Sequence, residues 1–230
     1  MKKLFAILLA LALCLAVTAC GKTEEAPAGT DVTVTIVDMG LPVVPAETVS
    51  VTDQDSDGTL TIYDALACAH AQYSSGGAAA FAAEETEYGL SMTRLWGIEN
   101  GGSYGYYLNH ASPMSLLDPV SAGDTVTAYS YSDLENWSDV YAWFEGSCGD
   151  GTAELTLYAQ QFDENWNPVT APVAGAEIFV NDSPTGLVTD DAGRVSVPFT
   201  DADATGHNGR ILITAASDEM VLVTPVFRAK

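Results

Sequence analysis

The stretch Asp53-Gln54-Asp55-Ser56-Asp57-Gly58-Thr59-Leu60-Thr61-Ile62-Tyr63-Asp64 organises the first half of this chain. Its first, third and fifth positions are carboxylates, its sixth is a glycine suited to a sharp turn, and its twelfth is again an acid. A hard divalent cation takes six to eight oxygen ligands, and this spacing brings oxygens to one point. The sequence therefore predicts a structural calcium site whose ligands are Asp53, Asp55, Asp57, Thr59, Thr61 and Asp64.

The same residues also have an interpretation without a metal. Thr61 and Asp64 form a Thr-x-x-Asp pattern typical of a capping box at a helix start. Apolar residues follow on one helical face at Ile62, Leu66 and Ala69. Three carboxylates on alternate residues repel one another unless a cation lies among them, which favours the calcium site over a bare acidic turn.

Outward from this stretch, the chain divides by pattern into two segments. Residues 31–147 are mixed: apolar residues alternate at Val32, Val34 and Ile36, as in a half-buried strand, and one helix follows the acidic loop. Residues 150–230 consist almost wholly of short β-rich runs between turns, which is typical of a β-sandwich. The expected fold class is α+β: a small β-grasp-like domain with one main helix, followed by an all-β sandwich domain.

Residues 55–66 resemble a dockerin, or EF-hand-like, calcium repeat, but dockerins carry two copies and this chain has one. The wider pattern, with the loop and helix followed by Gly101-Gly102-Ser103-Tyr104-Gly105-Tyr106-Tyr107-Leu108-Asn109, resembles the transcobalamin-like C-terminal domain of bacterial surface proteins. That resemblance implies the β-grasp-like fold and a link to corrinoid binding. Residues 172–178 and 189–194 resemble bacterial immunoglobulin-like or carboxypeptidase-regulatory-like modules, which usually serve as spacers or adhesion units.

The densest aromatic and polar cluster is a candidate ligand site that consists of Tyr104, Tyr106, Tyr107, Asn109 and His110. As a ridge, these side chains could stack on a flat ligand or a sugar. Alternatively, alternate tyrosines fill the core while the others cover the sheet, as a strand requires in any case.

The N-terminus has the features of an export signal. Met1-Lys2-Lys3 precedes an apolar run from Leu4 to Val17 that is short for a membrane span, and Leu15 to Cys20 resembles a bacterial lipoprotein cleavage box. We expect a signal peptide over residues 1–19, lipidation of Cys20 and a flexible linker over residues 20–30. The mature chain would be extracytoplasmic and lipid-anchored to the bacterial cell membrane.

Cys68 and Cys148 are the cysteines that this assignment leaves over. Outside the cell they could form a disulfide, worth on the order of 4 kcal/mol for so long a loop, or remain two separately buried thiols.

Charge and histidine content exclude several classes of function. The formal charge is −23, and loss of Lys2 and Lys3 would make it two units more negative, at −25. Nucleic acid is excluded as a partner because no basic patch exists to displace its counterions. The three scattered histidines do not have the spacing of a catalytic triad or a zinc site, so we expect no enzymatic activity.

Together these patterns predict a non-catalytic, calcium-stabilised surface lipoprotein that binds a small molecule or a surface ligand. A corrinoid is the most specific ligand that the resemblance implies. The alternative is an adhesion or scaffold module that binds protein or glycan.

Overall fold

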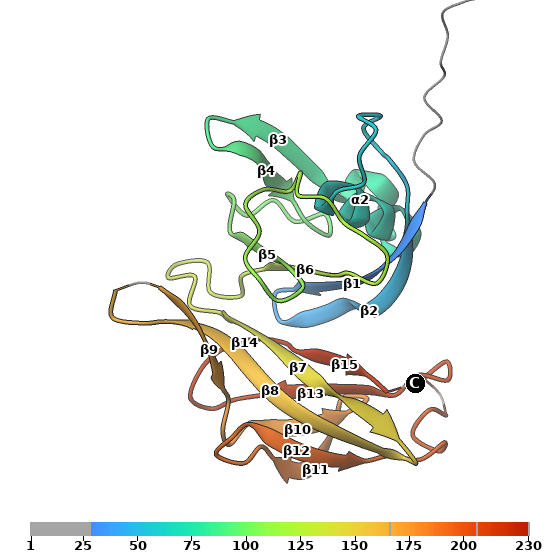
Figure 1. Ribbon diagram of the computed structural model, residues 1–230, viewed down its shortest axis with the longest axis vertical. Coiled ribbons are helices and arrows are strands. Elements are labelled where there is room, and N and C mark those ends of the chain that lie inside the picture. The colour runs from blue at the N-terminus through green and yellow to red at the C-terminus, as the bar shows by residue number, and fades with distance from the viewer. Residues whose placement is uncertain (1–28, 166, 206, 230) are drawn as a thin grey trace, which may run out of the picture.

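The structure, a computed structural model, describes residues 29–165, 167–205 and 207–229. Of these described residues, 49% lie in strands and 8% in helices, with a single α-helix among them, and the strands form several sheets. The fold is therefore mostly β and β-sandwich-like (Figure 1). The expected α+β class with one main helix is wrong.

The first sheet has the spatial order β2–β1–β6–β5. Its strands are β1 (Thr30–Asp38), β2 (Leu41–Val51), β5 (Tyr104–Leu108) and β6 (Thr125–Ser130). β1 lies inside this sheet, antiparallel to β2 and parallel to β6. Valines and isoleucines of β1 alternate with threonines, so one face of the sheet is apolar and the other carries hydroxyl groups.

Helix α2 (Ile62–Tyr73) packs on the apolar face of this sheet. Thr61 is its N-cap, and Thr61 with Asp64 forms the predicted capping box. A 3-10 helix, η1 (Gly77–Ala80), leads from α2 into a separate two-stranded sheet, formed by β3 (Ala82–Thr86) and β4 (Gly89–Arg94). Buried residues of α2, β1, β2, β4 and β6 share one hydrophobic cluster.

The rest of the described chain forms two more sheets that enclose a second hydrophobic cluster. One has the order β12–β8–β7–β14, with β9 paired to β8, and the other has the order β11–β10–β13–β15. The strands are β7 (Val140–Gly149), β8 (Thr152–Phe162), β9 (Pro168–Pro172), β10 (Glu177–Val180), β11 (Ser183–Val188), β12 (Arg194–Pro198), β13 (Leu212–Ala216), β14 (Leu222–Val223) and β15 (Val226–Arg228). We refer to these two sheets together as the sandwich.

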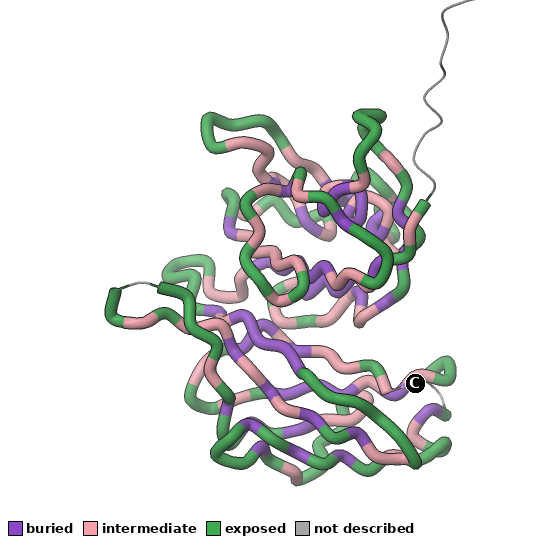
Figure 2. Tube along the Cα trace, in the orientation of Figure 1, coloured by how far each residue is buried: buried purple, intermediate pink, exposed green. Residues whose placement is uncertain are grey.

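The first sheet lies between helix α2 and the sandwich (Figure 1). A third hydrophobic cluster joins the first sheet to the sandwich and contains Val37, Tyr129, Tyr141, Trp143 and Val223. Buried residues run along β1 and along the first half of β7, whereas the second half of β7 and the hairpin turns at the periphery are exposed (Figure 2).

The fold class differs from expectation because several strands contain prolines, which usually argue against a strand. β2 contains Pro42 and Pro45, β11 contains Pro184, and β9 begins and ends with proline. Each lies at the edge of its sheet, where a strand tolerates the missing N–H of proline.

Two further predictions concern the boundaries of the chain's parts. The signal peptide and Cys20 lie outside the described residues, and β1 already begins at Thr30, the last residue of the predicted linker. The division between residues 147 and 150 remains a prediction. β7 reaches across it and contributes Ala142 and Phe144 to the sandwich cluster.

Candidate functional site

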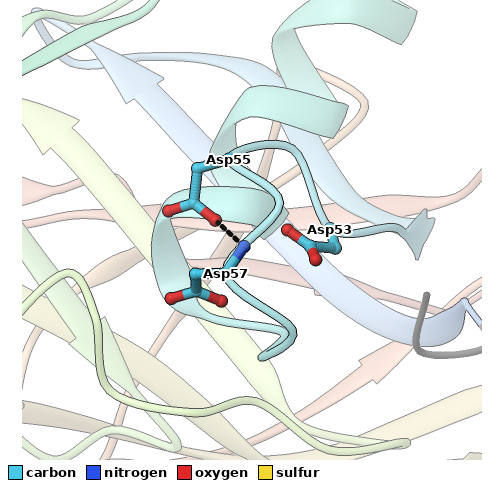
Figure 3. Close-up of side chains that lie close together, drawn as sticks. All are labelled: Asp53, Asp55 and Asp57. Atoms are coloured by element: carbon cyan, nitrogen blue, oxygen red, sulfur yellow. Dashed lines mark hydrogen bonds between the residues drawn. The ribbon is translucent and has the colours of Figure 1, made fainter. Parts of the chain in front are cut away.

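The acidic loop lies between β2 and α2, and three of its carboxylates converge (Figure 3). Asp53, Asp55 and Asp57 each offer one carboxylate oxygen, and these oxygens all lie within 4.8 Å of one another. Asp55 and Asp57 are exposed and Asp53 is partly buried. Carboxylate oxygens at this separation are the ligand type that calcium prefers, so the chemistry of the triad fits that ion.

Backbone N–H groups fix the conformation of the loop. Asp53 accepts hydrogen bonds from the N–H groups of Ser56 (2.7 Å) and Gly58 (3.0 Å), and Asp55 accepts one from Asp57 (3.2 Å; Figure 3). Gly58 has φ of +88°, a conformation that side chains rarely adopt. The glycine at the sixth position therefore serves the turn.

The electrostatics differ between the first two carboxylates of the triad. Desolvation, the largest single influence, acts to raise the pKa of Asp53, yet hydrogen bonds from Gly58, Ser56 and their neighbours together hold that pKa below its usual value. Desolvation, followed by the negative charges of Asp57 and Asp64, raises the pKa of Asp55. A bound cation would relieve this repulsion.

The other three predicted ligands lie at the start of the helix. Asp64 is fully buried: its Oδ1 accepts from the N–H of Gln54 (2.6 Å), and its Oδ2 accepts from the N–H (2.9 Å) and hydroxyl (2.8 Å) of Thr61. The N–H of Thr59 donates to Asp57 (2.7 Å). Asp64 and Thr61 thus cap the helix, and the convergent triad consists of Asp53, Asp55 and Asp57.

The sheet divides the predicted aromatic cluster between its two faces. Tyr104 and Tyr106 point to the face that α2 covers and pack against the first cluster, whereas Tyr107 belongs to the cluster at the sandwich. Tyr107 stacks on Tyr141, with ring centroids 3.7 Å apart. The five residues therefore do not form one surface.

Hydrogen bonds restrict what three members of this cluster can offer a ligand. The Tyr104 hydroxyl lies 2.6 Å from the carbonyl oxygen of Ile98 and accepts from the N–H of Asn100 (3.1 Å). Asn109 has φ of +51° and bonds Asp124 and Thr125 through its amide, so it shapes the turn after β5. His110 Nδ1 lies 2.9 Å from the Tyr141 hydroxyl.

Tyr104 and Tyr106 also line a groove of about 330 Å³ between β4 and β5, which we call the tyrosine groove. Tyr88 and Met114 line it as well, and they are 89% and 93% exposed, respectively. Sequence analysis missed both residues because they lie on separate turns without periodicity. An exposed aromatic residue and an exposed methionine beside two tyrosines are typical of an interaction site.

Both cysteines that could have paired are free thiols. The Cys68 thiol contacts the backbone and hydroxyl of Thr52, and the exposed Cys148 thiol lies 3.5 Å from the carbonyl oxygen of Ala229. The disulfide is therefore not formed in this structure, and Cys148 is not a buried thiol either.

Among the described residues, no helix is long and apolar enough to cross a membrane. Comparison of the chain with protein-family models, with curated proteins and with solved structures found no match.

Proposed function

We propose that this chain is a non-catalytic surface lipoprotein whose calcium-stabilised first half captures a small molecule in the tyrosine groove. The observation that carries the proposal is the exposure of Tyr88 and Met114 at a groove lined by Tyr104 and Tyr106. Aromatic faces and a thioether provide dispersion contacts to a flat, largely apolar ligand without a fixed hydrogen-bonding pattern. The macrocycle of a corrinoid, the ligand that the family resemblance implies, offers a flat face for such contacts.

Calcium acts in this proposal as a structural ion. Asp53, Asp55 and Asp57 would hold it at the loop between β2 and α2, and the capping box would fix the start of the helix that supports the sheet. Lipidation at Cys20 would tether the protein outside the membrane.

The bonding of the His70 and His110 rings supports a non-catalytic role. His70 lies within 2.7 Å of the Leu66 carbonyl oxygen and accepts from the N–H of Trp96, so both ring nitrogens have backbone partners. His110 bonds a tyrosine hydroxyl rather than a serine or cysteine nucleophile.

Titration of the full chain with cobalamin tests the proposal. We expect saturable binding that weakens in Tyr88→Ser and Met114→Ser, because each variant loses contacts in the groove. Both side chains are exposed, so their loss leaves the core intact. Val188→Ser, at an apolar residue on β11 that is 58% exposed, serves as the control. No measurable binding at high micromolar cobalamin would contradict the corrinoid assignment.

The alternative is adhesion to protein or glycan, and the loop from Ser132 to Asp139 favours it. Trp137 is 59% exposed at this loop, which buried Asp139 holds through the N–H and hydroxyl of Ser132. Beads coated with the chain should then adhere to protein- or glycan-coated surfaces and lose adhesion in Trp137→Ala. Adhesion that persists in this variant would argue against the loop.

A further inference from the structure

A cavity of about 540 Å³ lies between the first sheet and strands β7, β14 and β15 of the sandwich. Ligand sites for small molecules span about 300 to 1,000 Å³, so its size suits a small ligand. One wall is the face of the first sheet that α2 does not cover, and the other wall belongs to the sandwich. The cavity is on the opposite side of the sheet from the tyrosine groove.

Threonines form the wall that the first sheet contributes. Thr48, Thr33 and Thr125 are cross-strand neighbours on β2, β1 and β6, and Thr35 and Thr127 form a second row. All five line the cavity. Strand alternation sends the intervening valines into the core, so the hydroxyl groups gather on this one face.

The Thr35 hydroxyl has no hydrogen-bond partner within the part of the chain that the structure describes. Thr35 is only 7% exposed and lines the cavity. Among the described residues, the one fully buried side-chain oxygen without a hydrogen-bond partner is Glu47 Oε1, so the Thr35 hydroxyl is accessible from the cavity and can bond a ligand or water there. The Thr127 hydroxyl, by comparison, lies 3.5 Å from the Tyr141 hydroxyl.

Aromatic rings close one end of the cavity. His110 stacks on Trp143, with ring centroids 5.1 Å apart and planes 8° apart, and Tyr141 lies beside both. All three line the cavity. A ligand that reaches from the threonine wall to this end meets hydroxyl groups on one side and aromatic carbon on the other.

The lining offers no free charge. Its one lysine, arginine or acidic side chain is Arg228, and that residue already donates to Glu47 (3.0 Å). Burial lowers the pKa of His110, which keeps its ring neutral at pH 7. An anion or a cation would enter without a counter-charge, whereas a neutral ligand rich in hydroxyls loses no ionic hydration.

We propose that this cavity binds a small neutral saccharide, with the threonine hydroxyls bonding the sugar hydroxyls and the His110–Trp143 end packing on a C–H face of the ring. Sugars combine a hydroxylated rim with apolar C–H faces, and the two parts of the lining match them. The site is separate from the tyrosine groove and does not depend on it.

The test is calorimetric titration of the full chain with glucose, galactose, mannose, N-acetylglucosamine and their disaccharides at millimolar concentration. We expect at least one to bind and to change tryptophan fluorescence. Thr35→Val removes the hydroxyl while keeping the shape of the side chain, and should weaken binding by about tenfold, the effect of one lost hydrogen bond. Thr170→Val, on exposed strand β9, should bind as the unmodified chain does.

Three results would overturn the proposal: no binding by any of these sugars, equal affinity in Thr35→Val, or glucuronate binding as tightly as glucose. Cobalamin titration of the same variants keeps the two sites distinct. Thr35→Val should leave cobalamin binding unchanged, and Tyr88→Ser should leave sugar binding unchanged.

Discussion

Three carboxylates converge at the loop before α2, and their mutual repulsion is a cost that a cation removes. We predict that calcium raises the melting temperature. For a site of the modest affinity common outside cells, a tenfold to hundredfold excess over Kd adds about 1.4 to 2.7 kcal/mol, or about 3 to 10 °C for a chain of this length. The measurement is thermal unfolding in calcium and in chelator.

The control for this prediction separates calcium from loop structure. Asp53→Ala with Asp57→Ala should abolish the calcium-dependent shift, whereas the exposed Asp191→Ala with Asp218→Ala removes the same charge and should leave the shift intact. Melting that is identical in calcium and chelator would refute the site.

A second residue-scale prediction concerns His70, which is fully buried with both ring nitrogens bonded. Burial lowers its pKa from 6.5, although the Leu66 carbonyl opposes the shift. The unfolded chain therefore binds the proton more readily than the folded chain. The contribution of neutral His70 to the free energy of unfolding is present above pH 6.5 and is lost as the pH falls through the lowered pKa. Urea unfolding between pH 5 and 7 should show stability decreasing on acidification, less steeply in His70→Gln. Equal slopes would contradict this.

Part of the candidate site was predictable because it is local in sequence. The triad and the turn at Gly58 follow from spacing within one loop, and the capping box of Thr61 and Asp64 follows from spacing within one helical turn. The tyrosine groove was not predictable, because Tyr88 and Met114 come from turns that only the folded chain brings together.

At the scale of elements, α2 depends on its cap. Thr61 is 1% exposed and its hydroxyl lies between Asp64 Oδ2 and the Asp64 N–H. We predict that Thr61→Ala lowers the free energy of unfolding by about 1 to 2 kcal/mol in chelator. Ser74→Ala, at the partly buried C-cap of the helix, should lower the free energy of unfolding by less than about 0.5 kcal/mol. Urea unfolding measures both, and a neutral Thr61→Ala would show that the cap is dispensable.

Strands with a regular pattern of β-forming residues could be predicted from the sequence, and strands without one could not. β5, β6 and β10 coincide closely with runs of β-forming residues. β2 and β11 could not be predicted, because proline within a run of residues usually argues against a strand. Only the sheet order shows that both lie at edges, where proline is tolerated. These added strands overturned the expected α+β class.

At the scale of the whole molecule, an ionic clasp joins the two halves. Glu47 on β2 is nearly buried, with Arg228 donating to its Oε2 (3.0 Å) and Arg210 2.7 Å from its Oε1. The Arg210 contact lacks hydrogen-bond geometry, so it acts through charge. Both arginines come from the sandwich half of the chain.

We predict that Glu47→Gln lowers the free energy of unfolding by about 2 to 3 kcal/mol. This loss is smaller than is usual for a fully buried pair, because each arginine is about one-third exposed. Glu99→Gln breaks the exposed pair with Arg94 and should cost at most about 1 kcal/mol. Chemical unfolding measures both. Equal costs would mean that burial does not strengthen the clasp.

The position of β1 has a mechanical consequence. β1 begins at Thr30, and it lies inside its sheet, parallel to β6 from Thr33 opposite Thr125 to Asp38 opposite Ser130. In the lipid-anchored protein that we propose, a pull on the tether reaches β1 first, while the load on the sandwich enters through the far end of β6. The hydrogen bonds between the two strands then resist together in shear instead of opening one at a time. A surface protein exposed to flow would thus transmit the load between its anchor and the sandwich through a strand pair that is loaded in shear.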